Sequence, residues 1–342
     1  MARALGAAVA LAAALVHAAS ASPPAVILDY ADLPGWEDDD HAAALAVFDD
    51  VCPDLRRPDW AAVCAFATTG PEPRRFFETF FRPVRLGGPD GGLFTGYYEP
   101  EVRASPRRTG YFRVPVYRMP PELEPGTPWL TRAEIETGDS LHERDLEIAW
   151  LSDPVDLHHL QLQGSGRLNM TDGRVLRLGF AGQNGHPRRP AVAELIRRGV
   201  FEPHEASTDA LRAWVRRNPL EGRELLRDDS SYVFFRVLED YPPQLGPPGA
   251  MNRPLVEGRS LAIDPAHVPL GAPVWVEARG AEPIRTLMIA LDTGGAIKGA
   301  QRGDIFFGTG AAAGRAAARV RDRGQLVVLL PVELAYRLVP EG

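Results

Sequence analysis

Apolar residues recur at three- and four-residue spacing between Glu37 and Phe81. The segments AAALAVFDDV and WAAVCAFATTG show this period, and PEPRRFFETFFRP opens with prolines that suit the first turn of a helix. This pattern predicts an N-terminal helical segment within residues 22–90.

The pattern changes after Leu93. From Leu93 to about Arg236, short apolar runs are separated by glycine and proline, which predicts strands. Helical periodicity is confined here to three stretches, residues 188–198, 208–217 and 220–227, and Ser207 or Thr208 is the expected N-cap of the second. We therefore expect a β domain with helices on its outside.

The stretch YPPQLGPPGAMNRP, residues 241–254, predicts a linker, because its prolines cannot donate to a sheet and its glycines relax the chain. The short apolar runs LAI, PVWVEA, LMIAL, IFFG and QLVVLLP follow it. They predict an all-β closing region folded as a compact barrel.

Composition supports a globular, mainly β protein. The chain has 342 residues, with 45% hydrophobic and 24% charged side chains, which is enough for two cores. Glycine and proline are both abundant, at 33 and 32 residues, so the protein should be rich in loops.

The first residues, MARALGAAVALAAALVHAASAS, are typical of a secretory signal. They contain one arginine, an apolar run from Leu5 to Val16, and the small residues Ala19, Ser20 and Ala21. We expect cleavage after Ala21, since the apolar run is shorter than the ~20 residues of a spanning helix; an uncleaved anchor is the alternative. No cysteine lies near this point, so we expect no lipid anchor and a soluble mature protein.

Charge argues against nucleic acid as a partner. Removal of Arg3 with the signal changes the net charge from −7 to about −8, and no basic block remains. Cys52 and Cys64 are the only cysteines, and export would place them in an oxidising compartment. A disulfide joining two helices is the expected pairing, and two buried free thiols are the alternative.

The histidines do not predict a metal site. His142-Glu143 and His204-Glu205 are not followed by a histidine at the spacing of a zinc motif. His158-His159 has no carboxylate-rich helix around it, so no metal is expected.

Three aspartates near the C-terminus carry the chemistry. Asp264, Asp292 and Asp304 lie in SLAIDPAHVPLGAPVWVEA, LMIALDTGGAIKG and QRGDIFFGTG, and Lys298 is the only lysine in the chain. Aspartates that follow apolar runs and precede glycine turns are expected at strand ends, where a cleft can hold them for proton transfer. Each aspartate could instead cap its turn by accepting backbone hydrogen bonds.

Several segments resemble one family. They are FTGYYEP at 94–100, LQGSG at 162–166, AGQNGHP at 181–187, SSYVFFR at 230–236 and the three aspartate segments. Together they resemble the membrane-bound lytic murein transglycosylase A family, and the closing region resembles its 3D domain, from about residue 90 to the C-terminus. The resemblance implies a double-psi β-barrel with a second β domain inserted after its first strand. The barrel would comprise residues 91–103 and 246–342, and the insert residues 104–245.

The resemblance also implies an activity. It is cleavage of the β-1,4 bond between N-acetylmuramic acid and N-acetylglucosamine in peptidoglycan, by attack of the muramoyl C6 hydroxyl on its own C1. Asp304 would be catalytic, with Asp292 beside it and Asp264 third. The implied protein acts on glycan strands without a cofactor. Because the lipid-attachment cysteine of the family is missing, we expect a periplasmic monomer with at most weak outer-membrane or wall association.

Physical reasoning supports a single catalytic carboxyl. An intramolecular hydroxyl supplies its own nucleophile, so the second carboxylate of an ordinary glycosidase is not needed. Asp304 must then carry a proton, and both burial and a neighbouring Asp292 charge would raise its pKa. Lys298 would oppose this shift, so we expect it to face sugar hydroxyls or Asp292 rather than Asp304, or to be a plain surface residue.

The matching segments also suggest substrate contacts. The candidate residues are Thr95, Gly96, Tyr97, Tyr98, Gln163, Ser165 and Asn184. Tyr97 and Tyr98 alternate along a strand, so one can stack on a sugar while the other packs in the core. Gln163 and Ser165 either bind acetamido groups or satisfy their own loop.

Two residues depart from the family pattern. Arg188 stands where the resemblance implies an aromatic residue, and Asn252 where it implies glycine, so contacts on that side are expected to differ.

The sequence leaves two other functions open. One alternative to an enzyme that cuts glycan strands is a wall-binding or wall-loosening module that does not cut. The other is an aspartic protease, since Asp292 begins a DTG sequence, but that fold needs a second such turn and the chain has none.

Overall fold

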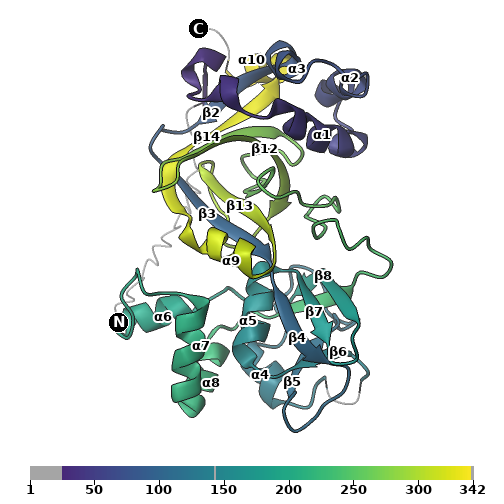
Figure 1. Ribbon diagram of the computed structural model, residues 1–342, viewed down its shortest axis with the longest axis vertical. Helices are drawn as coiled ribbons and strands as arrows, with labels where there is room; N and C mark the ends of the chain where they lie inside the picture. The colour runs from purple at the N-terminus through teal and green to yellow at the C-terminus, as the bar shows by residue number, and fades with distance from the viewer. Residues whose placement is uncertain (1–24, 142–143, 340–342) are drawn as a thin grey trace, which may run out of the picture.

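The computed structural model describes residues 25–141 and 144–339, so the predicted signal at 1–21 lies outside the described residues. The fold is mainly β. One half holds a closed sheet with helices packed on it, and the other holds a second sheet with its own helices (Figure 1).

Six strands of the first sheet form a closed ring, because β14 pairs with both β11 and β3 in the order β14-β11-β12-β10-β13-β3. These strands are β3 (Gly92–Glu99), β10 (Ser260–Ile263), β11 (Pro273–Ala278), β12 (Ile284–Thr293), β13 (Arg302–Thr309) and β14 (Arg321–Pro331). β10 runs parallel to β12, and β13 runs parallel to β3. All six residues of β11 are buried, as expected of a strand with packing on both faces.

Residues before β3 also join this half. Strands β1 (Ala25–Ile27) and β2 (Phe81–Leu86) extend the sheet beyond β14, and three helices share its core. The helices are α1 (His41–Val51), α2 (Pro58–Ala67) and α3 (Pro73–Phe80). The prediction of a purely helical segment over 22–90 was therefore incomplete. Phe81–Leu86 places arginines at its partly exposed positions and pairs with β14, which makes it a strand.

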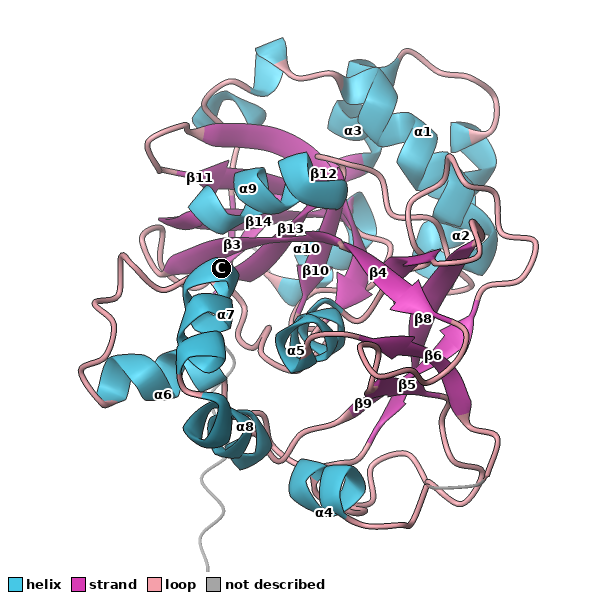
Figure 2. Cartoon of the chain, turned by 60° about the horizontal axis from the view of Figure 1, so that its bottom comes forward, coloured by secondary structure: helices cyan, strands magenta, loops and turns pink. Residues whose placement is uncertain are grey.

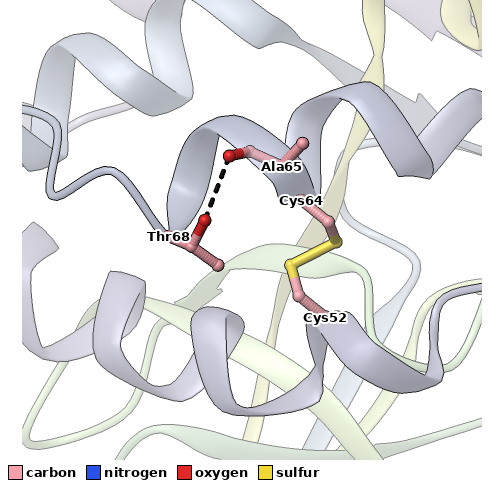
Figure 3. Close-up of a disulfide and its surroundings, with 4 residues drawn as sticks. All are labelled: Cys52, Cys64, Ala65 and Thr68. Carbon is pink, nitrogen blue, oxygen red and sulfur yellow. Dashed lines mark hydrogen bonds between the residues drawn. A yellow bond between two sulfur atoms is a disulfide. The ribbon is translucent and has the colours of Figure 1, made fainter.

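Cys52 and Cys64 form a disulfide, with their Cα atoms 5.3 Å apart (Figure 3). Cys52 begins the short 3₁₀ turn η3 (Cys52–Asp54) after α1, and Cys64 lies on α2. The bond therefore ties these two helices together against the barrel.

The second sheet has the strand order β5-β6-β4-β7-β8-β9. Its strands are β4 (Glu101–Ser105), β5 (Val114–Tyr117), β6 (Glu147–Leu151), β7 (Gly166–Met170), β8 (Val175–Gln183) and β9 (Val233–Val237). Its helices are α4 (Arg132–Thr137), α5 (Pro154–Gln163), α6 (Ala191–Arg197), α7 (Thr208–Arg217) and α8 (Pro219–Asp228). The three predicted helices correspond to α6, α7 and α8, and Ser207 caps α7 by accepting from the Ala210 amide at 3.1 Å.

The chain passes from one sheet to the other at Pro100, between β3 and β4 (Figure 2). This is earlier than the predicted boundary after residue 103, because β4 belongs to the second sheet. Glu99 is fully buried at the crossing and binds Arg167 at 2.8 Å and Arg177 at 2.7 Å from the second sheet. A buried carboxylate needs such partners, so the crossing is held rigidly.

The prediction of an all-β closing region was wrong at two places. Helix α9 (Gly310–Arg319) follows β13, and α10 (Val332–Leu338) follows β14. The α9 sequence GAAAGRAAAR is rich in alanine, the strongest helix former, and this local preference was overlooked.

The predicted linker is packed against the barrel. Gly249 lies so close to β12 that an added Cβ would meet the Leu291 carbonyl oxygen at 2.6 Å. Its amide donates to the Arg253 carbonyl at 2.9 Å, and Leu255 is buried in the barrel core. The glycines of this segment therefore allow it to pack closely on β12, and they do more than make the chain flexible.

Candidate active site

Asp304 lies on β13 directly opposite Thr95 on the parallel strand β3. Thr95 Oγ1 donates a hydrogen bond to Asp304 Oδ1 at 2.5 Å. Among the described residues no partner is found for Asp304 Oδ2, and that atom is not buried from solvent. Asp304 is half-buried, so one of its carboxyl oxygens is available to a ligand.

Asp292 ends the apolar run of β12 and is held by three donors. Tyr97 Oη donates to its Oδ2 at 2.9 Å, and the amides of Ala250 and Thr293 donate to its Oδ1 at 3.0 and 2.9 Å. Ala250 belongs to the predicted linker, so that segment contributes directly to the site. The Tyr97 ring also packs on Phe306 of β13, with ring centroids 5.3 Å apart.

Burial raises the pKa of both carboxyls. The pKa of Asp304 is raised to about 6, chiefly by burial, with a further rise from the Asp292 charge and opposing effects of Thr95 and Arg302. The pKa of Asp292 is also raised to about 6 by burial, against the three hydrogen bonds it accepts. Two carboxyls that interact in this way titrate as a pair. Because their pKa values are close to neutral pH, one of the two can act as a general acid there.

Asp264 and Lys298 lie together at another turn. The Lys298 ammonium is 3.9 Å from Asp264 Oδ1, and among the described residues it forms no ion pair with Asp292 or Asp304. Asp264 is 6% exposed, and its carboxylate accepts from the amides of Gly299 and Ala266 at 2.8 and 3.3 Å. These bonds hold the pKa of Asp264 below its ordinary value, with the Gly299 amide as the largest cause. Asp264 therefore fixes the glycine-rich loop that carries Lys298. Of the two expected partners of Lys298, Asp292 is not the one observed, and contact with sugar hydroxyls stays a prediction.

Other candidate residues lie where the two halves meet. An added Cβ on Gly96 would meet Ala317 of α9 at 2.6 Å, so this glycine allows the helix to approach and does not face a ligand. The Tyr98 amide donates to Gln163 Oε1 at 3.0 Å, and Tyr98 Oη lies 2.8 Å from His159 Nε2. Gln163 thus joins the barrel to helix α5, while Ser165 is buried beside it.

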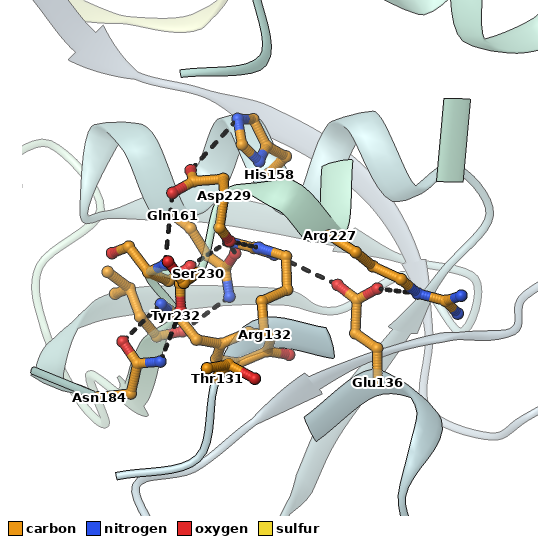
Figure 4. Close-up of polar contacts among 12 residues, drawn as sticks. Thr131, Arg132, Glu136, His158, Gln161, Asn184, Arg227, Asp229, Ser230 and Tyr232 are labelled. Carbon is orange, nitrogen blue, oxygen red and sulfur yellow. Dashed lines mark hydrogen bonds and ion pairs between the residues drawn. The ribbon is translucent and has the colours of Figure 1, made fainter. Parts of the chain in front are cut away.

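Asn184 is corrected from a substrate contact to a structural residue. It is 0% exposed, and its side-chain amide donates to the carbonyls of Leu130 and Ser230, both at 2.8 Å. Its Oδ1 accepts from the Tyr232 amide at 2.8 Å. Figure 4 shows Asn184 within this cluster of the second half, which also contains Arg132 and Asp229. All of its polar atoms are used, so none remains for a sugar.

The sequence reasoning missed Arg302. Its guanidinium donates to Thr95 Oγ1 at 2.7 Å, and the residue also lines a cavity of about 400 Å³. The cavity is lined by Leu86, Gly87, Gly91, Leu93, Lys298, Gly299, Ala300, Gln301 and Arg302. Arg302 precedes Asp304 by two positions on a strand, so alternation alone places both side chains on one face.

The described residues contain neither a metal-binding cluster nor a membrane-spanning helix. They contain no group of three or more histidine, cysteine, aspartate or glutamate side chains arranged to hold a metal ion. Nor does any of their helices have the length and apolar character needed to cross a membrane.

Comparison with known families identifies both halves of the chain. Residues 93–236 match the MltA specific insert domain, and residues 259–330 match the 3D domain. The first match covers the second sheet, and the second covers the three aspartates.

Curated relatives and solved structures agree with these matches. Membrane-bound lytic murein transglycosylase A of Escherichia coli K12 is 37% identical over 247 residues, which span 69% of this chain and 65% of the relative. The Vibrio cholerae protein of the same name is 30% identical over 84% of this chain and 80% of its own length.

Solved structures extend the match to nearly the whole chain. A membrane-bound lytic murein transglycosylase from Agrobacterium tumefaciens superposes with a TM-score of 0.82 at 32% identity, covering 92% of this chain and 99% of that one. E. coli MltA with bound chitohexaose gives a TM-score of 0.70 at 30% identity, covering 91% and 92%. The chain therefore belongs to the membrane-bound lytic murein transglycosylase A family.

Proposed function

We propose that this protein is a lytic transglycosylase that cleaves the β-1,4 bond between N-acetylmuramic acid and N-acetylglucosamine in peptidoglycan and leaves 1,6-anhydromuramoyl ends. One observation carries the proposal. Asp304 is half-buried with a raised pKa, one oxygen bound to Thr95 and the other open. A carboxyl in this state can give and take a proton beside a bound sugar.

The hydrogen bonds favour Asp304 as the proton carrier of the pair. Asp292 accepts three hydrogen bonds, two of them from backbone amides, and each favours its ionised form. Asp304 accepts one, from Thr95. The ionised Asp292 then raises the pKa of Asp304, so that Asp304 keeps its proton up to about pH 6.

The reaction follows from a single acid. Asp304 gives its proton to the glycosidic oxygen as the bond from that oxygen to the muramoyl C1 breaks. The resulting carboxylate takes the proton of the C6 hydroxyl while the C6 oxygen bonds to C1. The two transfers regenerate Asp304 and consume no water. The intramolecular hydroxyl acts at a high effective concentration, which removes the need for a second catalytic carboxylate.

The substrate class is supported by a relative. E. coli MltA has been solved with chitohexaose bound, at 30% identity to this chain. Chitohexaose shares the β-1,4-linked N-acetylhexosamine backbone of a glycan strand. In this chain Tyr97 packs on Phe306, so Tyr98, which is partly exposed and lies where the two halves meet, is the expected stacking partner of a sugar ring.

We further infer that the closed ring is a double-psi barrel, with its parallel pairs β10–β12 and β13–β3 in support. The second sheet would then be an insertion after the first barrel strand. We also infer a periplasmic, monomeric enzyme.

The test is mass analysis of products from purified sacculi. An anhydro end is lighter by one water than the reducing end that hydrolysis leaves, so the proposal requires the lighter product. Asp304→Asn should abolish release while leaving binding to sacculi intact. Binding by the unmodified protein without any released muropeptide would instead favour the wall-binding module, and reducing-end products would contradict the mechanism.

A further inference from the structure

Arg302 reaches the catalytic carboxyl through Thr95. It lies on β13 two residues before Asp304, and its guanidinium donates to Thr95 Oγ1 at 2.7 Å. It also donates to the carbonyls of Leu93, at 3.2 Å, and Gly303, which fix its orientation. Among the described residues Arg302 forms no direct ion pair with Asp304. The threonine hydroxyl is therefore the contact between them.

This contact determines the direction of the threonine hydrogen bond. A guanidinium has donors and no acceptor, so it can only present hydrogens to Thr95 Oγ1. The single hydroxyl proton of Thr95 is thereby free to point at Asp304 Oδ1, 2.5 Å away. Asp304 Oδ1 must then accept, and an acidic proton on that oxygen would face the threonine proton.

We propose that Arg302 is a positioning residue that, by orienting the Thr95 hydroxyl, assigns the catalytic proton of Asp304 to Oδ2. Oδ2 is the oxygen without a partner among the described residues and with access to solvent. The Oδ2–H bond breaks as the proton passes to the leaving glycosidic oxygen, and it forms again with the proton of the C6 hydroxyl. This inference rests on the proposed function of Asp304 and adds a role that neither family match assigns.

Other charged groups surround the pair and must be separated from this effect. Asp292 on β12 raises the pKa of Asp304, and Tyr97 on β3 is hydrogen-bonded to Asp292. Arg302 itself lowers the pKa of Asp304 through its charge. Arg321 on β14 lies opposite Thr95 in the neighbouring strand and is exposed. A charge effect acting through space would not need Thr95, whereas positioning through the hydroxyl does.

A double-mutant cycle separates a charge effect of Arg302 through space from its positioning effect through the Thr95 hydroxyl. Arg302→Met and Thr95→Val should each lower kcat about 10- to 30-fold with KM changed less than about twofold, because proton placement is lost while the sugar contacts remain. The double variant should be within about twofold of the worse single variant, since both break one contact. Thr95→Ser should restore activity to within about threefold, and the matched charge control Arg321→Met should stay within about twofold.

The pH profile gives a second readout that a purely structural role would not move. Loss of Arg302 or of the Thr95 hydroxyl removes an influence that lowers the pKa of Asp304, so the alkaline limb should shift upward by about 0.5 to 1 pH unit in either variant. The same shift can be followed in the ¹³C signal of the Asp304 carboxyl, which needs no turnover. If Arg302→Met unfolds the protein, Arg302→Gln and the Thr95 variants carry the test.

Independent, multiplying losses for Arg302→Met and Thr95→Val would overturn the proposal, as would an equal loss for Arg321→Met or no rescue by Thr95→Ser. A wild-type protein with no lytic activity would end the proposed function. The ¹³C titration would still decide whether Arg302 acts through the Thr95 hydroxyl. Because the Arg302 charge also lowers the pKa of Asp304 directly, Arg302→Met should shift the titration in the Thr95→Val background too, but by less than in the wild-type background. An equal shift in the two backgrounds would overturn the proposal.

Discussion

The polar side chains of the barrel and of the inserted half, which comprises strands β4 to β9 and helices α4 to α8, differ in how completely they are hydrogen-bonded. In the inserted half, Asn184 is sealed and every polar atom of its side chain has a partner. In the barrel, Asp304 has one bound oxygen and one open oxygen. A fully satisfied polar group stabilises a fold and has no capacity left for a ligand, whereas a partly satisfied one retains it.

Solvent access completes this distinction. The inserted half also contains buried polar atoms without a hydrogen-bond partner, among them His158 Nδ1 and Asp229 Oδ2, but these atoms have almost no accessible surface. Asp304 Oδ2 is accessible. Unmet hydrogen-bonding capacity can serve a reaction only where a substrate can reach it, which is why the proposed function rests on the barrel.

The largest effect should come from Asp304→Asn. Asparagine can still accept from Thr95 but cannot give a proton to a leaving oxygen, so we expect kcat/KM to fall by about 10³-fold. Release of soluble muropeptides from sacculi measures this. Retention of more than a tenth of wild-type activity would place the acid elsewhere.

Asn184→Leu should separate stability from activity in the inserted half. It removes three hydrogen bonds and leaves the Leu130 carbonyl and the Tyr232 amide without a partner, so we expect a loss of about 3 kcal/mol in the free energy of unfolding. The Ser230 carbonyl still accepts from the Arg132 amide at 3.2 Å. Urea unfolding measures the loss. Activity per folded molecule should stay within about twofold. A specific loss of kcat in a stable variant would return Asn184 to the substrate site.

Asp292→Asn should alter the site without removing its acid. Loss of the neighbouring negative charge lowers the pKa of Asp304, so less of it is protonated at pH 7 and activity there should fall about tenfold. The alkaline limb of the pH profile should move to lower pH. An unchanged limb would show that the two carboxyls do not interact.

The smallest expected effect is on the pH dependence of stability. The folded pKa of Asp304 is about 6, above its ordinary 3.8, so the native state binds more protons than the unfolded state between these values. Stability from this group is therefore present at low pH and lost as pH rises through about 6. Asp304→Asn should remove about 1 kcal/mol of that decline between about pH 5.3 and 7. Parallel stability curves for the two proteins would contradict the raised pKa.

The sequence predicted the mainly β architecture, the helices α6 to α8 and the importance of the aspartate segments. Periodicity carried these predictions, because it reports which face of an element is buried. It could not reveal that Ala250 of the linker binds Asp292, or that Gly96 lies against α9, since both are contacts between segments far apart in the chain. The same limit explains Asn184: burial comes from packing, and a short motif does not record it.

Arg302 was within reach of the sequence. Its spacing from Asp304 on a strand places both side chains on one face, and only the pairing of β13 with β3 was needed to bring Thr95 between them. Helix α9 was likewise readable from its alanines. Helix propensity could therefore have predicted α9, and strand alternation could have predicted that Arg302 and Asp304 share a face.

The most direct measurement is the ¹³C titration of the two carboxyls in the wild-type protein, with Asp292 and Asp304 assigned through their asparagine variants. Asp304 should keep its proton until about pH 6 and should ionise at a higher pH than Asp292. Ionisation of Asp304 near pH 4, as in an ordinary exposed aspartate, would contradict its assignment as the proton donor.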